Sequence, residues 1–363
     1  MPKVGFLLFL VTIVISFLGI FILYESSSYT AILNIGDRYH FIKNQLMWVF
    51  GGIVIAFIIS LFDYRKFYPF ALPFLGVTIF LLVVVFIPGI GLELKGSHRW
   101  IDFKLFVMQP SELLKISLTM YLAAWLSRKE SNRLVAFLIL FFACTGLVAM
   151  EPDLGSALVV ATMSVIIYFL SGAKIKDMLI IAGVVIVGII ALITFEPYRV
   201  ERFMAFRHFD VNDLNTTSYH IRQVLIAVGS GGVAGVGLGN SVQKYAYVPE
   251  NTTDSIFAIY AEETGFLGSL LLFAVVGFQL YLGYRIALAA KDSFGMLFGI
   301  GIITYLCIQT FLNVGSQIVV VPMTGVPLPF ISYGGSAMLI NFAAIGVMMS
   351  IARFSAKEER KKR

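Results

Sequence analysis

The chain has 363 residues, of which 59% are hydrophobic and only 13% are charged, and its formal net charge is +6. Soluble globular domains carry about a quarter charged residues, so this composition excludes a soluble protein. Apolar runs of about 17–25 residues recur along the whole length, and a helix of that length crosses the hydrocarbon core of a bilayer. We therefore predict an all-α polytopic membrane protein in which residues 1–363 form a single integral membrane domain.

Ten transmembrane helices are predicted in chain order. They lie near 4–24, 46–62, 69–89, 109–127, 134–150, 154–171, 178–195, 256–284, 295–317 and 335–353. The fifth and sixth runs are each about a membrane thickness long, free of proline, and separated by Glu151-Pro152-Asp153. This pattern predicts two helices joined by a tight turn and not one broken helix. No cleavage site follows the first run, so it is predicted to be a span and not a removable signal.

Lysine and arginine are unevenly distributed between the predicted loops. Every short segment on the side of the N-terminus carries basic residues, and the tail 354–363 is strongly basic, whereas the opposite loops 151–153 and 318–334 carry none. Basic residues accumulate in cytoplasmic loops, so both termini are predicted to be cytoplasmic. The positive net charge follows from this rule, and no nucleic-acid partner is implied.

The longest connection, about residues 196–255 between the seventh and eighth spans, is then extracytoplasmic. A loop of this length among short ones indicates either function or disorder. Aromatic residues, an apolar run and a glycine-rich stretch over 229–240 favour an ordered loop. The stretch 220–228 is predicted to be a short amphipathic helix at the membrane face.

Two acids, Glu250 and Asp254, stand where this long loop becomes the eighth apolar span. A charge at a membrane boundary is costly, so an acid kept there indicates function. Asp254 is equally well placed to cap the following helix or to favour its dipole. Glu250 could equally be a solvated loop acid. The residues alone leave these alternatives open.

Five groups of motifs resemble those of the SEDS family (shape, elongation, division and sporulation), the peptidoglycan glycosyltransferases of the FtsW and RodA type. They are Arg99-Trp100-Ile101; Gln109-Pro110-Ser111-Glu112-Leu113 with Lys115; Pro152-Asp153-Leu154-Gly155-Ser156-Ala157; Gly237–Lys244 with Pro249-Glu250 and Thr253-Asp254; and Pro327–Ser336. The segment 237–244 is more similar to the division or sporulation branch than to the elongation branch. The chain departs from the family pattern at Thr252 and Ser255, where a histidine and a phenylalanine are usual.

The resemblance implies that the protein polymerises lipid II at the outer face of the cytoplasmic membrane. A sugar hydroxyl attacks while the pyrophosphate-linked lipid leaves, so the reaction needs a general base and positive groups for the leaving group. Asp254 is the implied base. Cationic candidates are Arg99, Lys115, Lys244 and Arg202, and a divalent cation (Mg or Mn) near Asp254 is an alternative. The implied partners are a class B penicillin-binding protein and other membrane proteins of the division or elongation complexes.

The remaining candidates for substrate binding each have a structural interpretation. Glu112 and Lys115 form an i, i+3 pair that neutralises two charges at the membrane boundary. Arg99 beside Trp100 is an interfacial anchor, and Asp153 after Pro152 is a turn acid and helix cap. Glu262, two turns into the eighth span, must face the bundle or a wet cavity, and is predicted to support the site.

Ser332 lies in a segment, Ser332–Ser336, that superficially resembles the turn of a serine nucleophile. No histidine falls in any predicted span, because His40, His98, His208 and His220 all lie in outside loops. A Ser–His intramembrane protease is therefore improbable. The prolines at 322, 327 and 329 instead predict a re-entrant loop at the outer face.

Two other classes of function compete with the transferase. A lipid II flippase would also place charges such as Lys115 in a helical bundle. However, the halves of the chain show no duplication, and the polar motifs gather on one face and not at the midplane. The third alternative is a non-catalytic scaffold of the division machinery.

Overall fold

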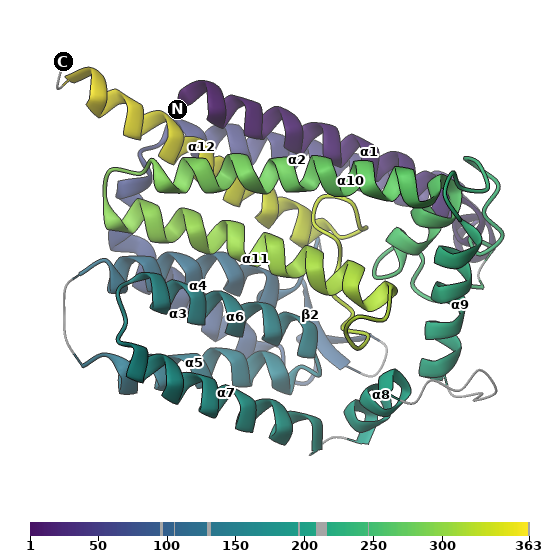
Figure 1. Ribbon diagram of the computed structural model, residues 1–363, viewed down its shortest axis with the longest axis horizontal. Helices are drawn as coiled ribbons and strands as arrows, with labels where there is room; N and C mark the ends of the chain where they lie inside the picture. Colours follow the sequence, from purple (N-terminus) through teal and green to yellow (C-terminus); the bar gives the residue numbers. More distant parts are fainter. Residues whose placement is uncertain are drawn as a thin grey trace.

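Helices parallel to one axis make up most of the protein (Figure 1). The computed structural model describes residues 1–94, 97–104, 106–128, 132–194, 197–207, 216–245 and 247–361. The long helices are α1 (Pro2–Ile35), α2 (His40–Leu61), α3 (Ala71–Val84), α4 (Pro110–Leu126), α5 (Leu134–Met150), α6 (Leu154–Leu170), α7 (Ile175–Thr194), α10 (Ile256–Leu288), α11 (Ser293–Gln317) and α12 (Gly335–Lys361). A 3-10 helix, η1 (Tyr64–Phe70), precedes α3. Both termini lie at the same end of the bundle.

Each predicted span coincides with one of these helices, and the tight turn at 151–153 is confirmed. Among the described residues, six helices are long and apolar enough to cross a membrane, and α5 and α6 are shorter apolar helices. The mainly helical membrane fold is therefore confirmed. The assignment of ten membrane crossings and the cytoplasmic position of the termini stay predictions.

Helix α1 continues to Ile35, well beyond the predicted end near residue 24. Its polar last turns have partners in the long loop. The amide nitrogen of Asn251 donates to the carbonyl of Ser26 at 3.0 Å, and Lys244 Nζ contacts Glu25 Oε2 at 3.2 Å. The extension thus depends on residues more than 200 positions away, which a local hydrophobic pattern does not reveal.

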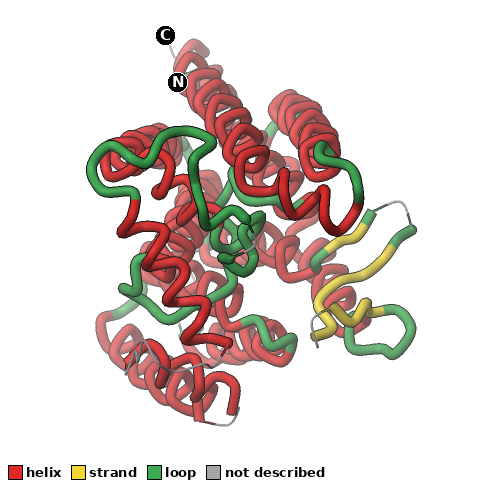
Figure 2. The backbone as a smooth tube through the Cα atoms, turned by 90° about the vertical axis from the view of Figure 1, so that its right-hand side faces the viewer, coloured by secondary structure: helices red, strands yellow, loops and turns green. Residues whose placement is uncertain are grey.

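A small antiparallel sheet joins α3 to α4 and was not predicted. It comprises β1 (Gly91–Leu94), β2 (Ser97–Asp102) and β3 (Val107–Met108) in that order. The strands are short, and their pairing contains an irregularity between Leu92 and Glu93. The sheet lies at the end of the bundle opposite the termini (Figure 2), and Arg99 and Trp100 belong to its strand β2.

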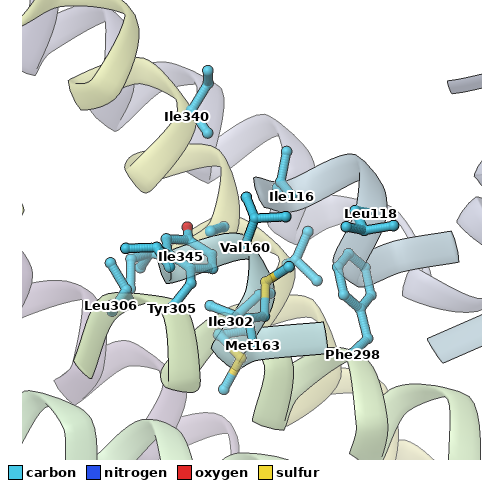
Figure 3. Packing of buried hydrophobic residues seen from close by; sticks show 14 of the residues in the cluster. Ile116, Leu118, Val160, Met163, Phe298, Ile302, Tyr305, Leu306, Ile340 and Ile345 are labelled. Atoms are coloured by element: carbon cyan, nitrogen blue, oxygen red, sulfur yellow. The ribbon is translucent and has the colours of Figure 1, made fainter. Parts of the chain in front are cut away.

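Helix α11 runs through the middle of the bundle and packs against α4, α6 and α10. Phe298, Ile302 and Tyr305 of α11 meet the side chains of α4 and α6 (Figure 3). The facing residues that Figure 3 labels on those two helices are Ile116, Leu118, Val160 and Met163. This central position brings the polar C-terminal end of α11 beneath the loops that contain the predicted site.

The long connection between α7 and α10 is ordered in its described parts. It contains α8 (Pro197–Arg207) and α9 (Thr216–Ser230), and α9 packs on α10. The predicted helix over 220–228 is confirmed as the middle of α9. The glycine-rich segment, defined here as residues 231–245, then lies along the first turns of α10. Its backbone groups bond to α10, with Val236 N donating to Glu262 O at 3.0 Å and Gly237 N to Glu263 O at 3.1 Å.

Gly265 interrupts α10 at the place where the glycine-rich segment crosses it. Its backbone has φ 66° and ψ −162°, a conformation that only glycine adopts readily. A Cβ added there would lie 2.3 Å from Gly235 N and 2.7 Å from Val233 O. The break frees backbone groups of α10, and Phe266 N and Leu267 N donate to Gly232 O and Val233 O instead.

We expect Gly265→Ala to lower the free energy of unfolding by roughly 3 kcal/mol or more, because backbone strain and a steric clash add. Thermal unfolding of the purified protein in detergent measures this. Gly277→Ala is the matched control, since it lies in the same helix and a Cβ there meets nothing within 4 Å. Equal melting temperatures for the two variants would contradict the prediction.

Candidate active site

Side chains of α11 hold the acid loop, defined here as residues 249–255. Asn313 Nδ2 and Gln317 Nε2 donate to the carbonyl oxygen of Asp254, at 2.9 and 2.8 Å. Gln317 Oε1 also accepts from Ala258 N at 2.7 Å, so α11 caps the start of α10. The residue at the N-cap position is Ser255, and its side chain makes no capping hydrogen bond. Asp254 is half-buried and lies just before α10. The two hydrogen bonds from α11 fix its backbone.

The proline-rich segment, residues 318–334, clamps the acid loop from the other side. Ser332 Oγ donates to Thr253 O at 2.6 Å and accepts from Leu328 N at 2.8 Å, and Tyr333 N donates to Thr252 O at 3.0 Å. The hydroxyl of Ser332 is therefore engaged with backbone groups on both sides and ties the proline-rich segment to the acid loop. The segment folds back into the protein, as predicted from its prolines, and Leu328 and Ile331 are buried.

The carboxylate of Asp254 faces the proline-rich segment at Gly325. A Cβ at Gly325 would lie 3.3 Å from Asp254 Oδ2, and Gly325 has φ 68°. Any side chain there would crowd the carboxylate. Asn313 Nδ2 also donates to Val326 O at 2.8 Å, so one amide ties both loops together.

Glu250 forms the turn that shapes the acid loop. Its φ of 53° lies in the left-handed region, and its carbonyl accepts from Thr253 N and Ser255 N, both at 3.1 Å. Its carboxylate accepts from Thr253 Oγ1 at 3.2 Å. A non-glycine residue held in this region costs about 1–3 kcal/mol, and such strain clusters at functional sites.

Lys115 and Glu112 form a buried ion pair below the proline-rich segment. Lys115 Nζ lies 2.7 Å from Glu112 Oε1 and 2.7 Å from Gln309 Oε1, and both charged side chains are buried. Gln309 Nε2 then donates to Pro327 O at 2.9 Å. The predicted i, i+3 pair is present, and it supports the segment that faces Asp254. Among the described residues, Glu112 Oε2 has no hydrogen-bond partner.

Arg99 and Asp153 are engaged with the turn between α5 and α6. Arg99 Nε donates to Glu151 O at 2.7 Å, and Arg99 Nη2 donates to Pro152 O. Asp153 Oδ1 caps α6 by accepting from Ser156 N at 2.9 Å, and Asp153 Oδ2 accepts from Gln109 Nε2 at 3.1 Å. Asp153 therefore caps α6, as its structural interpretation predicted, whereas Arg99 is bound to the turn between α5 and α6.

Glu151 is a buried acid in this turn that the sequence analysis treated only as part of a break. Both of its carboxylate oxygens are without hydrogen-bond partners among the described residues. The pKa of Glu151 is raised to about 9, chiefly by burial and also by the charge of Asp153, while Arg99 opposes the shift. The carboxyl group is therefore neutral at pH 7 and lies beside the N-terminal end of α6.

Lys244 and Glu262 fix the glycine-rich segment instead of lining the acid loop directly. Lys244 Nζ donates to Gly239 O at 2.7 Å and contacts Glu263 Oε1 at 3.3 Å. Glu262 accepts from Ser241 Oγ and from Val242 N, the latter at 3.3 Å. The link to the acid loop is indirect, because Asn251 Nδ2 donates to Lys244 O at 3.4 Å.

His220 of α9 reaches the acid loop, which the sequence analysis missed. Its Nε2 lies 2.7 Å from Ser255 Oγ. Burial lowers the pKa of His220 to about 4; Glu250 raises it and Arg202 lowers it. The imidazole is therefore neutral at pH 7. Ser255 bonds to His220 instead of capping its own helix, so α9 is connected to the residue after Asp254.

This contact predicts a pH dependence of stability. The folded-state pKa of about 4 lies below the ordinary value of 6.5, so the unfolded chain binds the proton more readily. The stability contributed by neutral His220 is complete above about pH 6.5 and is lost as the pH falls toward 4. Thermal unfolding between pH 4 and 7 should show a shallower decline for His220→Gln, which does not titrate. An unchanged profile would contradict the assignment.

Polar residues of α11 hold both loops of the candidate site. Their spacing in the sequence predicts that they share one face of the helix. Gln309, Asn313 and Gln317 recur every four residues and so share one face of an apolar helix. Polar side chains on one face of a membrane helix indicate a polar interior surface. His220 had no comparable signal, because its partner lies 35 positions away.

A divalent cation would find few protein ligands here. The described residues contain no group of three or more His, Cys, Asp or Glu side chains that could hold a metal ion.

Residues 6–357 match the model of the FtsW/RodA/SpoVE family, whose description is cell cycle protein. The chain belongs to this family. Its similarity to the stage V sporulation protein E of Bacillus subtilis (strain 168) is 35% identity over 355 residues, which covers 96% of this chain and 97% of that protein. The FtsW/RodA-type resemblance seen in the motifs is thereby confirmed.

Other members of the family are similar over nearly their whole lengths. The probable peptidoglycan glycosyltransferase FtsW of Trichlorobacter lovleyi is 34% identical over 351 residues, covering 95% of this chain and 92% of that protein. The crystal structure of the rod shape determining protein RodA of Thermus thermophilus matches with a TM-score of 0.70 at 25% identity, covering 95% of each chain. These matches support an FtsW-like member of the family with a RodA-like fold.

Proposed function

We propose that this protein is a peptidoglycan glycosyltransferase that polymerises lipid II into glycan strands during cell division or the maintenance of cell shape. The observation that carries the proposal is the fixed position of Asp254. Its backbone is bound by Asn313 and Gln317, and the loop around it is clamped by Ser332. Family members named peptidoglycan glycosyltransferases support the reaction type.

In this reaction Asp254 is the general base. Its carboxylate accepts the proton of the attacking C4 hydroxyl as the new glycosidic bond forms, and the bond to the lipid pyrophosphate breaks. A rigid backbone suits this role, because a general base must keep hydrogen-bond distance to the proton that it removes. Hydrogen bonds from α11 and the proline-rich segment supply that rigidity.

The departing pyrophosphate needs positive charge near the acid loop. Arg202 of α8 is the best-placed candidate, since its Nη1 donates to Met323 O at 3.3 Å, two residues from Gly325. Arg99, Lys115 and Lys244 have structural partners in this conformation and would act through the loops that they hold. The charge of Arg202 stabilises the leaving group in the transition state.

The proposal also includes location and partners. The site faces the outside of the bacterial cytoplasmic membrane, because the basic residues of the termini end indicate the cytoplasmic side. A class B penicillin-binding protein cross-links the strands, as the family resemblance implies. Other membrane proteins of the division or elongation complexes would bind the same bundle.

The experiment uses the full chain purified in detergent with its transpeptidase partner and supplied with lipid II. Polymerised glycan chains are the expected product. The same protein in vesicles is assayed for movement of lipid II between leaflets. Movement of lipid II without polymer would instead support a flippase. The absence of both activities would support a scaffold.

A further inference from the structure

A cavity lies at the termini end of the bundle, far from the acid loop. It lies between the start of α3 and the last turns of α4 and has a volume of about 260 Å³. In Figure 1 this is the left-hand end, where the chain termini are. The residues that line it include Tyr68, Leu72, Tyr121, Ala124, Trp125 and Arg128.

Arg128 gives the cavity a positive side, and Arg133 lies against Trp125 of its lining. Arg128 Nε donates to the hydroxyl of Tyr68 at 2.6 Å, and its guanidinium lies 5.5 Å from the centroid of that ring. The guanidinium of Arg133 lies 5.8 Å from the ring centroid of Trp125, and its Nη1 donates to Trp125 O at 3.1 Å. A planar guanidinium fixed in this way matches phosphate oxygens in pairs.

The remaining side of the cavity is aromatic and apolar. Tyr121 and Trp125 stack with their ring centroids 6.2 Å apart. Leu72, also in the lining, is 64% exposed and belongs to a helical segment long and apolar enough to cross a membrane. Tyrosine and tryptophan are typical of the membrane–water interface, and exposed apolar side chains below them face acyl chains.

We propose that this cavity binds the headgroup of an anionic phospholipid from the cytoplasmic leaflet. Arg128 contacts the phosphate, Tyr68 and Trp125 flank the headgroup, and an acyl chain follows Leu72. Charge complementarity favours an anionic occupant, because none of the described residues that line the cavity is acidic. Basic pockets between membrane helices on the cytoplasmic side bind acidic headgroups, and anionic lipids concentrate in that leaflet.

The test is native mass spectrometry of the full chain with phosphatidylglycerol, against phosphatidylcholine and inorganic phosphate as competitors. Phosphatidylglycerol should bind in preference to phosphatidylcholine, and Arg128→Gln should weaken its binding about tenfold, the loss expected for one charged hydrogen bond. Equal binding of the two lipids, or competition by inorganic phosphate at equal concentration, would overturn the proposal.

Arg285→Gln is the matched control. Arg285 lies at the same end of the bundle and stacks on Tyr281 at 5.9 Å, so the variant loses the same charge and the same kind of contact outside the cavity. Its lipid binding should be unchanged, and equal loss in both variants would indicate a general charge effect and overturn the proposal. Leu72→Trp fills the exposed mouth and keeps Arg128, so it should also lower binding. Retained binding in Leu72→Trp would place the lipid elsewhere.

Discussion

Asp254→Asn is expected to lower the rate of glycan polymerisation by about 10²–10⁴-fold, the usual contribution of a general base. Asparagine has the same shape, and the hydrogen bonds from Asn313 and Gln317 reach the backbone of residue 254 and not its side chain. The acid loop should therefore keep its position. The loss should fall on kcat, while KM for lipid II stays within a few-fold of the parent value.

The control for this prediction is Asp37→Asn. Asp37 lies between α1 and α2 at the same end of the bundle, and its exposed carboxylate pairs with Lys43 at 2.8 Å. Removing that charge should leave polymerisation unchanged. Glycan strands of equal amount and length from Asp254→Asn and the parent would refute the base assignment. A lower melting temperature for Asp254→Asn alone would show that the side chain supports the fold.

The helices were predictable because their signal is local. Each span is an apolar run long enough to cross a bilayer, and the acids at 151 and 153 interrupt two such runs within three residues. The position of Asp254 at the start of α10 was also predictable, since the change from polar to apolar residues lies there. The structure places Ser255 at the N-cap position, and Gln317 from α11 bonds to the first turn of α10.

What the sequence did not reveal depends on contacts between distant residues. The break at Gly265 exists because the backbone of residues 232–237 replaces the hydrogen bonds of α10. The extension of α1 depends on Asn251, and the placement of His220 depends on Ser255. Glu151 illustrates the same limit, because its burial follows from the packing of several segments and not from its neighbours in the chain.

We also expect a large loss of stability when the buried pair of Lys115 and Glu112 is broken. Lys115→Met should lower the free energy of unfolding by about 3–5 kcal/mol, because it leaves the Glu112 carboxylate buried without its cation. Thermal unfolding in detergent measures the loss. The double variant Glu112→Gln with Lys115→Met removes both charges and should recover most of the stability. If Lys115→Met is as stable as the parent protein, Lys115 is not needed to neutralise the charge of Glu112.

Activity of the double variant separates folding from catalysis. Lys115 Nζ holds Gln309 Oε1, and Gln309 holds the carbonyl of Pro327 in the segment that faces Asp254. Methionine cannot donate this hydrogen bond, so the proline-rich segment loses a support even when the bundle is stable. Since small displacements in an active site are costly, polymerisation should fall at least about tenfold in the double variant. Full activity at restored stability would instead mean that Lys115 only neutralises Glu112, and that Asn313 and Ser332 suffice to position the acid loop.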